Sequence, residues 1–286
     1  MTTDNTSKTI KLKDGRLLGY AEYGAQEGKP VFYFHGFPGS RLDWPLSDAD
    51  DSAAQLNVRI IAVDRPGMGL SDFKRGREIL DWPDDVIELA DALQVDHFAV
   101  LGISGGGPYA CACAFKIPEC WTTMAIVCGM GLAEAPGSKK GVAWTIPGKS
   151  SVIRRLLLML FAMGLRKNPD QFVLRSKEKF PEPDRLLLDQ PEVAKVYVDM
   201  LREAFRSGIG GVHHEAALYT RPWRFRLQDI SVEVHIWHGE MDLNVPILVG
   251  HYVADAIPNC HATFLKDEAH ISLPHNHIRE ILSILI

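Results

Sequence analysis

One short stretch, G-I-S-G-G at residues 102–106, constrains the fold of this 286-residue chain more than any other. It follows the apolar run at residues 97–100 and precedes residues 108–115, which are typical of a helix start. A buried strand, a very tight turn and a helix together present the central serine at the end of a sheet strand. Glycines two residues either side of Ser104 suit the close approach of the two backbones, where a Cβ atom would clash. The stretch therefore predicts an α/β sheet and a strained Ser104 whose hydroxyl lies above it.

The same glycines also fit a loose dinucleotide-binding loop, Gly105-x-Gly107-x-x-Ala110. That loop expects an acidic residue about 20 positions further on. Residues 124–131 contain none, and several predicted strands precede this one, although such a loop normally follows the first strand of its unit. We therefore expect no nucleotide, and no other cofactor.

Short apolar runs alternate with helical patterns over most of the chain. Predicted strands lie at residues 8–13, 17–23, 31–34, 58–63, 97–100, 124–128, 232–237 and 262–265, and predicted helices at 81–93 and 278–286. Continuous apolar strands of this kind belong to a mostly parallel sheet that helices cover on both faces. We predict one α/β core formed by residues 1–130 and 223–286. Residues 131–222 show only helical patterns and are predicted to form a cap over the carboxyl ends of the strands, where α/β proteins bind ligands.

The composition is ordinary for a globular protein, with 46% hydrophobic residues, 23% charged residues and a net charge of −5. This overall balance gives no reason to expect nucleic acid or an anionic membrane as a partner. Basic and aromatic residues do alternate at 220–226, but the segment is isolated in an acidic chain. The polar residues 1–7 lack the apolar core of a signal peptide, and the five cysteines form no C-x-x-C pair, so we expect buried thiols and a cytoplasmic location.

The apolar run at residues 156–165 is too short to span a bilayer, so we expect no integral membrane segment. Three interpretations of this run stay open. It can be a cap helix packed on the core, it can line a pocket for an acyl chain, or it can contact a membrane interface.

Two further residues complete a constellation with Ser104. Asp242 follows the predicted strand at 232–237, and His270 follows the predicted strand at 262–265. A serine becomes a good nucleophile when a neutral imidazole takes its proton, and a carboxylate on the other ring nitrogen fixes the tautomer of that imidazole. The order Ser, Asp, His, with each residue in a loop just after a strand, therefore predicts a catalytic triad.

Other candidates for these roles are weaker. Asp267 and Glu268 lie too close to His270 in sequence and are interpreted as solvated loop charges. Three other residues are interpreted as structural residues at strand ends: His35, His238 and Asp64. The remaining histidines fall in helix or strand patterns rather than at the carboxyl end of a strand: His251, His261, His275 and His277. The segment that begins His213-His214-Glu215 resembles the start of H-E-x-x-H, but Leu218 occupies the second ligand position. We therefore predict no metal site.

The motifs taken together resemble the α/β-hydrolase superfamily, and in particular its capped, esterase-like branch. The resemblance rests on H-G-F-P-G-S at 35–40, D-R-P-G-M-G-L-S at 64–71, the stretch around Ser104, residues 238–246 and His270. It covers nearly the whole chain outside the predicted cap. The resemblance implies that the backbone amides of Phe37 and Gly105 form an oxyanion hole.

The function expected from these residues is hydrolysis of a small-molecule carboxylic ester through an acyl-enzyme on Ser104. Three alternatives stay open: an aminopeptidase similar to proline iminopeptidase, a carbon–carbon bond hydrolase on the same triad, and a non-catalytic ligand receptor of the same fold. An aminopeptidase needs acidic groups in the cap, where Glu203 and Glu215 are available but are interpreted as exposed helix charges. A homodimer is a further open alternative.

Overall fold

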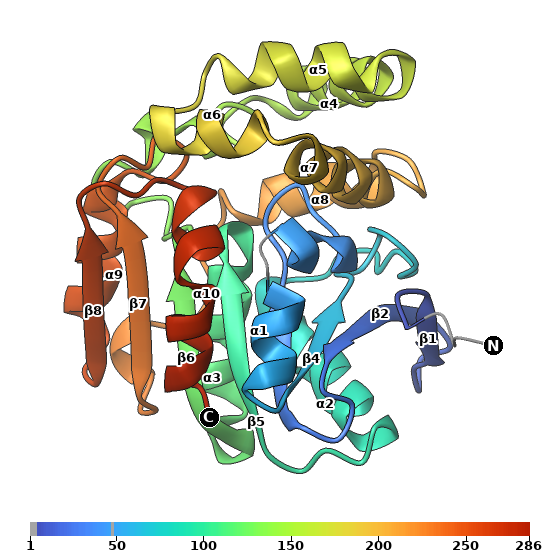
Figure 1. Cartoon of the computed structure of the whole chain (residues 1–286). Helices are drawn as coiled ribbons and strands as arrows, with labels where there is room; N and C mark the ends of the chain where they lie inside the picture. Colours follow the sequence, from blue (N-terminus) through green and yellow to red (C-terminus); the bar gives the residue numbers. More distant parts are fainter. Residues whose placement is uncertain (1–4, 47–48) are drawn as a thin grey trace.

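The computed structural model describes residues 5–46 and 49–286, which form a sheet, helices on both of its faces and a helical layer over one edge (Figure 1). The strands are β1 (Lys8–Lys11), β2 (Leu17–Gly24), β3 (Lys29–Phe34), β4 (Val58–Val63), β5 (Phe98–Ile103), β6 (Trp121–Val127), β7 (Val234–Gly239) and β8 (Cys260–Leu265). They follow the order β1-β2-β4-β3-β5-β6-β7-β8. The pairs β1–β2 and β2–β4 are antiparallel, and all the other pairs are parallel. The predicted, mostly parallel sheet is confirmed.

The central strands β3 to β7 are mostly buried on both faces, which explains why they contain continuous apolar runs, whereas the edge strands β1 and β8 are partly exposed. Helices α2 (Trp82–Ala92), α3 (Gly107–Lys116) and α9 (Ile247–Ala256) cover one face, and α1 (Ala49–Gln55) and α10 (Ser272–Ile284) cover the other. Along β5, Phe98 and Val100 enter the first of these cores, whereas Ala99 and Leu101 enter the second. The five cysteines are free, and three of them are buried.

The last helix differs from the prediction, because α10 begins at Ser272 rather than at residue 278. The helical pattern before residue 278 is obscured by Pro274. A proline is tolerated in the first turn of a helix, where its missing N–H would have no partner within the helix.

Five helices lie between β6 and β7: α4 (Ser151–Lys167), α5 (Pro169–Lys177), α6 (Glu182–Leu188), α7 (Pro191–Ala204) and α8 (Gly210–Leu218). We call them the cap, because they form the layer over the carboxyl ends of the parallel strands (Figure 1). Short 3₁₀ turns complete the chain: η1 (Arg41–Leu46), η2 (Ile79–Asp81), η3 (Ser104–Gly106), η4 (Pro118–Cys120), η5 (Ser138–Lys140), η6 (Val142–Trp144) and η7 (Leu227–Asp229). The insertion is helical as predicted, while its boundaries at residues 131 and 222 stay a prediction.

Among the described residues, no helix is long and apolar enough to cross a membrane. The apolar run at 156–165 belongs to α4, and part of it packs inside the protein, while an acyl-chain pocket along it stays a prediction. Leu158, Ala162 and Leu165 are buried in a core that α4 shares with α7, and Phe161 lines a cavity.

Candidate active site

Ser104 lies at the end of β5 with a φ angle of +53°, in the left-handed region that side chains other than glycine rarely adopt. Gly102 and Gly106, which flank Ser104, lie so close to neighbouring backbone atoms that a side chain at either position would clash. A Cβ atom on Gly102 would lie 2.9 Å from the Gly106 carbonyl oxygen, and one on Gly106 would lie 2.1 Å from the Phe34 carbonyl oxygen. The turn is therefore as tight as the sequence pattern predicts, and it holds the serine in a strained conformation.

The three residues predicted to form a triad lie in hydrogen-bonding contact. The Ser104 hydroxyl lies 2.9 Å from Nε2 of His270, and Nδ1 of the same ring lies 2.7 Å from Oδ2 of Asp242. The backbone amides of Asn244 and Val245 donate to the other carboxylate oxygen, Oδ1, at 2.8 Å and 2.9 Å. An ionised carboxylate only accepts hydrogen bonds, so the neutral His270 ring carries its proton on Nδ1 and leaves Nε2 free to accept from Ser104.

The charge balance of this pair also favours proton acceptance by His270. Burial alone would lower the pKa of His270, but the negative charge and hydrogen bond of Asp242 outweigh burial and raise that pKa above 6.5. Burial alone would likewise raise the pKa of Asp242, yet the interaction with His270 holds it below 3.8. Asp242 therefore stays ionised at neutral pH and stabilises the protonated form of His270.

The residues interpreted as structural occupy structural positions. His238 is buried and bonds through Nε2 to the Val245 carbonyl oxygen at 2.8 Å, which braces the loop that carries Asp242. His35 accepts a hydrogen bond from the Arg65 amide at 3.2 Å. Asp64 is buried and pairs with Arg41 at 2.9 Å.

The remaining rivals of Asp242 and His270 lie elsewhere. Asp267 is exposed, as interpreted, whereas the Glu268 side chain is only 14% exposed and pairs with His277 at 3.2 Å, outside the constellation. His251 and His261 lie in α9 and β8, and His275 and His277 lie in α10, as expected from their patterns.

The loop after β3 lies beside the turn that carries Ser104. A Cβ atom on Gly105 would lie 3.1 Å from the amide nitrogen of Phe37, so the two predicted oxyanion residues are neighbours. The Arg65 guanidinium fixes this loop by donating to the carbonyl oxygens of His35 at 2.6 Å and Gly36 at 2.7 Å. The amide of Gly36 donates to the buried carboxylate of Asp43 at 2.9 Å.

The interpretation of Glu215 as an exposed helix charge is wrong. Its side chain has no exposed area and pairs with both Arg65 and Arg77. Tyr109 and Tyr219 donate to it at 2.9 Å and 2.8 Å. Burial alone would raise the pKa of Glu215, but the two arginines hold it at about 2. This carboxylate on α8 therefore joins the cap to Arg65 and, through that residue, to the loop before Phe37.

The sequence does contain a signal for this burial. Glu215 shares one face of α8 with Val212 and Ala216, and Tyr219, just after the helix, continues the same spacing. All four are fully buried. Glu203, the other presumed exposed charge, is also half-buried, and it pairs with Arg41 at 2.6 Å.

A second carboxylate of the cap holds the loop of His270 and was not anticipated from the sequence. Asp184 on α6 is buried, and its Oδ1 accepts from the amides of Ile271 at 2.8 Å and Ser272 at 2.9 Å. These are the two residues that follow His270. The position of His270 therefore depends on the cap as well as on the sheet.

A cavity of about 830 Å³ lies between the cap and the sheet, and Ser104 and His270 line it. Its other walls are mostly apolar and come from both layers; they include Tyr33, Trp44, Phe161, Phe172, Tyr197 and Leu201. Asp43 also lines the cavity, and Tyr33 donates to its carboxylate at 3.0 Å. The arrangement presents a nucleophile, a base and backbone amides to a largely apolar ligand.

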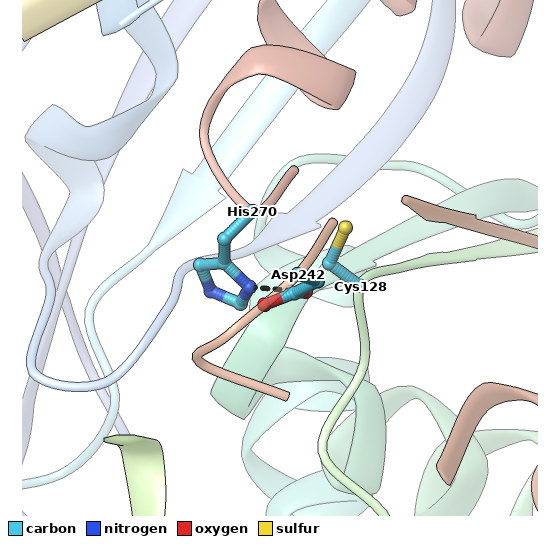
Figure 2. A group of neighbouring side chains, drawn as sticks. All are labelled: Cys128, Asp242 and His270. Atoms are coloured by element: carbon cyan, nitrogen blue, oxygen red, sulfur yellow. Dashed lines mark hydrogen bonds and ion pairs between the residues drawn. The ribbon is translucent and has the colours of Figure 1, made fainter. Parts of the chain in front are cut away.

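Cys128 lies beside the same constellation (Figure 2). It offers a sulfur that, with one oxygen of Asp242 and one nitrogen of His270, forms a group of potential metal ligands within 4.8 Å of one another. However, burial and the nearby Asp242 charge raise the pKa of the Cys128 thiol well above 9.0, and the thiol contacts the Ala269 carbonyl oxygen at 3.6 Å. Nδ1 of His270 and Oδ2 of Asp242 bond to each other, and Oδ1 of Asp242 accepts from two backbone amides, so these donor atoms are already engaged within the protein.

The sheet order, the helical insertion and the strained serine at the end of β5 define an α/β-hydrolase fold. The model of the alpha/beta hydrolase family matches residues 31–280, and the chain belongs to this family.

Known proteins similar to this chain carry several activities. A bifunctional esterase/perhydrolase of Acinetobacter calcoaceticus is 26% identical over 262 residues, which cover 87% of this chain and 88% of that protein. The acetyltransferase component of the acetoin cleaving system of Pseudomonas putida is 28% identical over 149 residues, or 52% of this chain, and the match spans only 40% of that protein. The solved structure of an esterase from Rhodococcus sp. ECU1013 is 20% identical, covers 98% of both chains and superposes with a TM-score of 0.72.

Proposed function

We propose that this chain is a serine hydrolase that cleaves carboxylic esters through an acyl-enzyme intermediate. The observation that carries the proposal is the continuous chain of contacts from the Ser104 hydroxyl through His270 to the buried Asp242, at the wall of a largely apolar cavity. The similarity to an esterase/perhydrolase over most of both chains supports the same class of substrate.

In this mechanism Ser104 attacks the ester carbonyl carbon while His270 takes the hydroxyl proton on Nε2. The carbonyl oxygen becomes an oxyanion, which the amides of Phe37 and Gly105 stabilise; loss of one such donor typically costs about 10²–10³ in rate. His270 then gives its proton to the leaving alkoxide, and the acyl group stays on Ser104. A water molecule, deprotonated by His270, attacks the acyl carbon. The bond between this carbon and the Ser104 oxygen then breaks, His270 returns the proton to that oxygen, and the carboxylic acid leaves.

The contacts of the cap acids favour an ester over a peptide with a free amino group. An aminopeptidase needs an available carboxylate near the nucleophile to bind the substrate ammonium. Glu215 and Glu203 are both engaged by arginines, and neither lines the cavity. Asp43 does line the cavity, but its carboxylate already accepts from the Tyr33 hydroxyl and the Gly36 amide. The apolar walls instead suit the acyl or alcohol chain of an ester.

The proposal is tested with p-nitrophenyl esters of increasing chain length, assayed beside aminoacyl anilides and with an active-site phosphonate. We expect ester hydrolysis and labelling of Ser104. The Ser104→Ala variant should lose labelling and turnover, by up to about 10⁶ in kcat by analogy with subtilisin. Labelling that persists in this variant would assign the nucleophile to another residue, and faster cleavage of the anilides would favour an aminopeptidase.

A further inference from the structure

The outer face of α4 carries a row of exposed apolar side chains that belong to none of the hydrophobic cores of the described residues. We call the six residues the α4 stripe: Val152, Ile153, Leu156, Met159, Leu160 and Met163, with exposed fractions between 44% and 80%. At about 100° per residue, they fall within one arc of the helix, opposite the buried Arg154, Leu158, Ala162 and Leu165. The helix therefore has two apolar faces, and the cap buries only one of them.

The stripe lies in the most basic part of an acidic chain. Residues 138–180 contain ten Lys and Arg but only two Asp and Glu, although the whole chain has a net charge of −5. Arg155, Arg166 and Lys167 are exposed on α4 itself, and Arg175 and Lys179 are exposed on or just after α5, which packs against α4. Exposed apolar side chains beside a concentration of positive charge are typical of helices that lie in the headgroup region of a membrane.

We propose that α4 docks this protein onto an anionic lipid surface, with the α4 stripe entering the interface and the neighbouring basic residues contacting lipid headgroups. Figure 1 shows α4 and α5 as the outer layer of the cap, on the side away from the sheet, where a flat surface can reach them. The proposed contact lies along the membrane, because no described helix can cross one.

Charge favours a lipid surface over a second copy of this chain. A symmetric dimer that covered the stripe would bring the same basic segment of both subunits together, since a two-fold interface uses the same patch on each partner. Like charges held close together oppose such an association. An anionic surface supplies the opposite charge and an apolar interior at once.

Docking of this kind would bring the cavity close to the lipid. Three residues of α4 line the cavity, and they lie on the side of the helix next to the stripe: Phe161, Gly164 and Lys167. An apolar ester could then pass from the membrane to Ser104 over a short path. This consequence depends on the proposed esterase activity, whereas binding to the lipid surface does not.

The test measures co-sedimentation of the full chain with vesicles of phosphatidylcholine alone or mixed with phosphatidylglycerol. We expect binding to the anionic vesicles, weakening as salt is added. Leu156→Glu with Leu160→Glu should reduce this binding at least about tenfold, because both side chains would carry charge into the interface. Leu248→Glu is the matched control, since Leu248 is 51% exposed on α9 of the core, and it should bind like the wild type.

Hydrolysis of a water-soluble ester should be unchanged in the double variant, because neither residue lines the cavity. Leu156→Gln with Leu160→Gln gives a milder, uncharged variant if the charged one does not fold. Failure of the wild type to bind anionic vesicles would overturn the proposal. A dimer in light-scattering measurements that the double variant abolishes, without vesicle binding, would identify the stripe as a self-association surface instead.

Discussion

At the scale of single residues, the charge balance between His270 and Asp242 sets a pH dependence for the proposed reaction. Only the neutral imidazole can take the proton of Ser104, so activity rises with pH as His270 loses its own proton. Asp242 raises the pKa of His270 above 6.5 despite burial. We expect kcat/KM, measured between pH 5 and 9, to rise above pH 6.5 as His270 loses one proton and then to level off.

The Asp242→Asn variant tests the cause of this shift. Without the negative charge of Asp242, the main influence that raises the pKa of His270 is lost, and the rise in kcat/KM should move to lower pH. The rate on the plateau should fall by roughly 10⁴, because an amide favours the wrong imidazole tautomer. Asp267→Asn is the control, since Asp267 is exposed outside the constellation. A wild-type rise near pH 4–5 would mean that a carboxylate, rather than His270, is the base.

The sequence places Ser104, Asp242 and His270 correctly relative to the strands, because each follows an apolar run that is easy to recognise. Their mutual contacts follow from the parallel sheet, which brings the carboxyl ends of its strands to one edge. Glu215 and Asp184 could not be placed in the same way. Their partners lie far away in sequence, and the contacts depend on how the cap is oriented over the sheet.

At the scale of secondary-structure elements, α6 contributes to the site through Asp184. Its replacement by alanine removes the acceptor for the amides of Ile271 and Ser272, which then lie buried without a partner. We expect a loss of about 1–3 kcal/mol of stability and faster hydrogen exchange at those two amides.

The matched variant is Asp184→Asn, which keeps an oxygen acceptor in the same position and should preserve much of the protection. Exchange measured by mass spectrometry or NMR, together with kcat/KM on a soluble ester, distinguishes the two variants. Unchanged protection in Asp184→Ala would mean that α6 does not hold the loop of His270.

The helices of the core are easier to predict than those of the cap for a physical reason. A core helix such as α2 buries one apolar face and exposes a polar one, so its spacing is clear. In α4 both faces are apolar, and the sequence alone does not say which one is buried. This is why packing on the core, lining of the cavity and contact with an interface all fitted the run at 156–165.

At the scale of the whole molecule, buried ion pairs join the cap to the core. Arg65 and Arg77 come from the core and meet Glu215 of α8, while Arg41 meets Glu203 of α7. Removal of one partner from such a buried group is costly, because the remaining charge stays out of water. We therefore expect the cap and the core to unfold together in acid rather than separately.

Glu215 makes this expectation measurable. Its pKa is about 2 in the folded chain, against an ordinary value of 4.5, so the carboxylate stabilises the fold above pH 4.5 and loses this effect as the pH falls toward 2. The shift corresponds to about 3 kcal/mol. We expect the free energy of unfolding of Glu215→Gln to lie below that of the wild type at pH 7, and the difference between the two to narrow steadily below pH 4.5.

Urea unfolding at pH 7, 5, 4 and 3 measures this gap in the free energy of unfolding. Glu192→Gln, at an exposed position on α7, is the control and should follow the wild type throughout. A gap that stays constant down to pH 3 would show that the charge of Glu215 does not link the cap to the core.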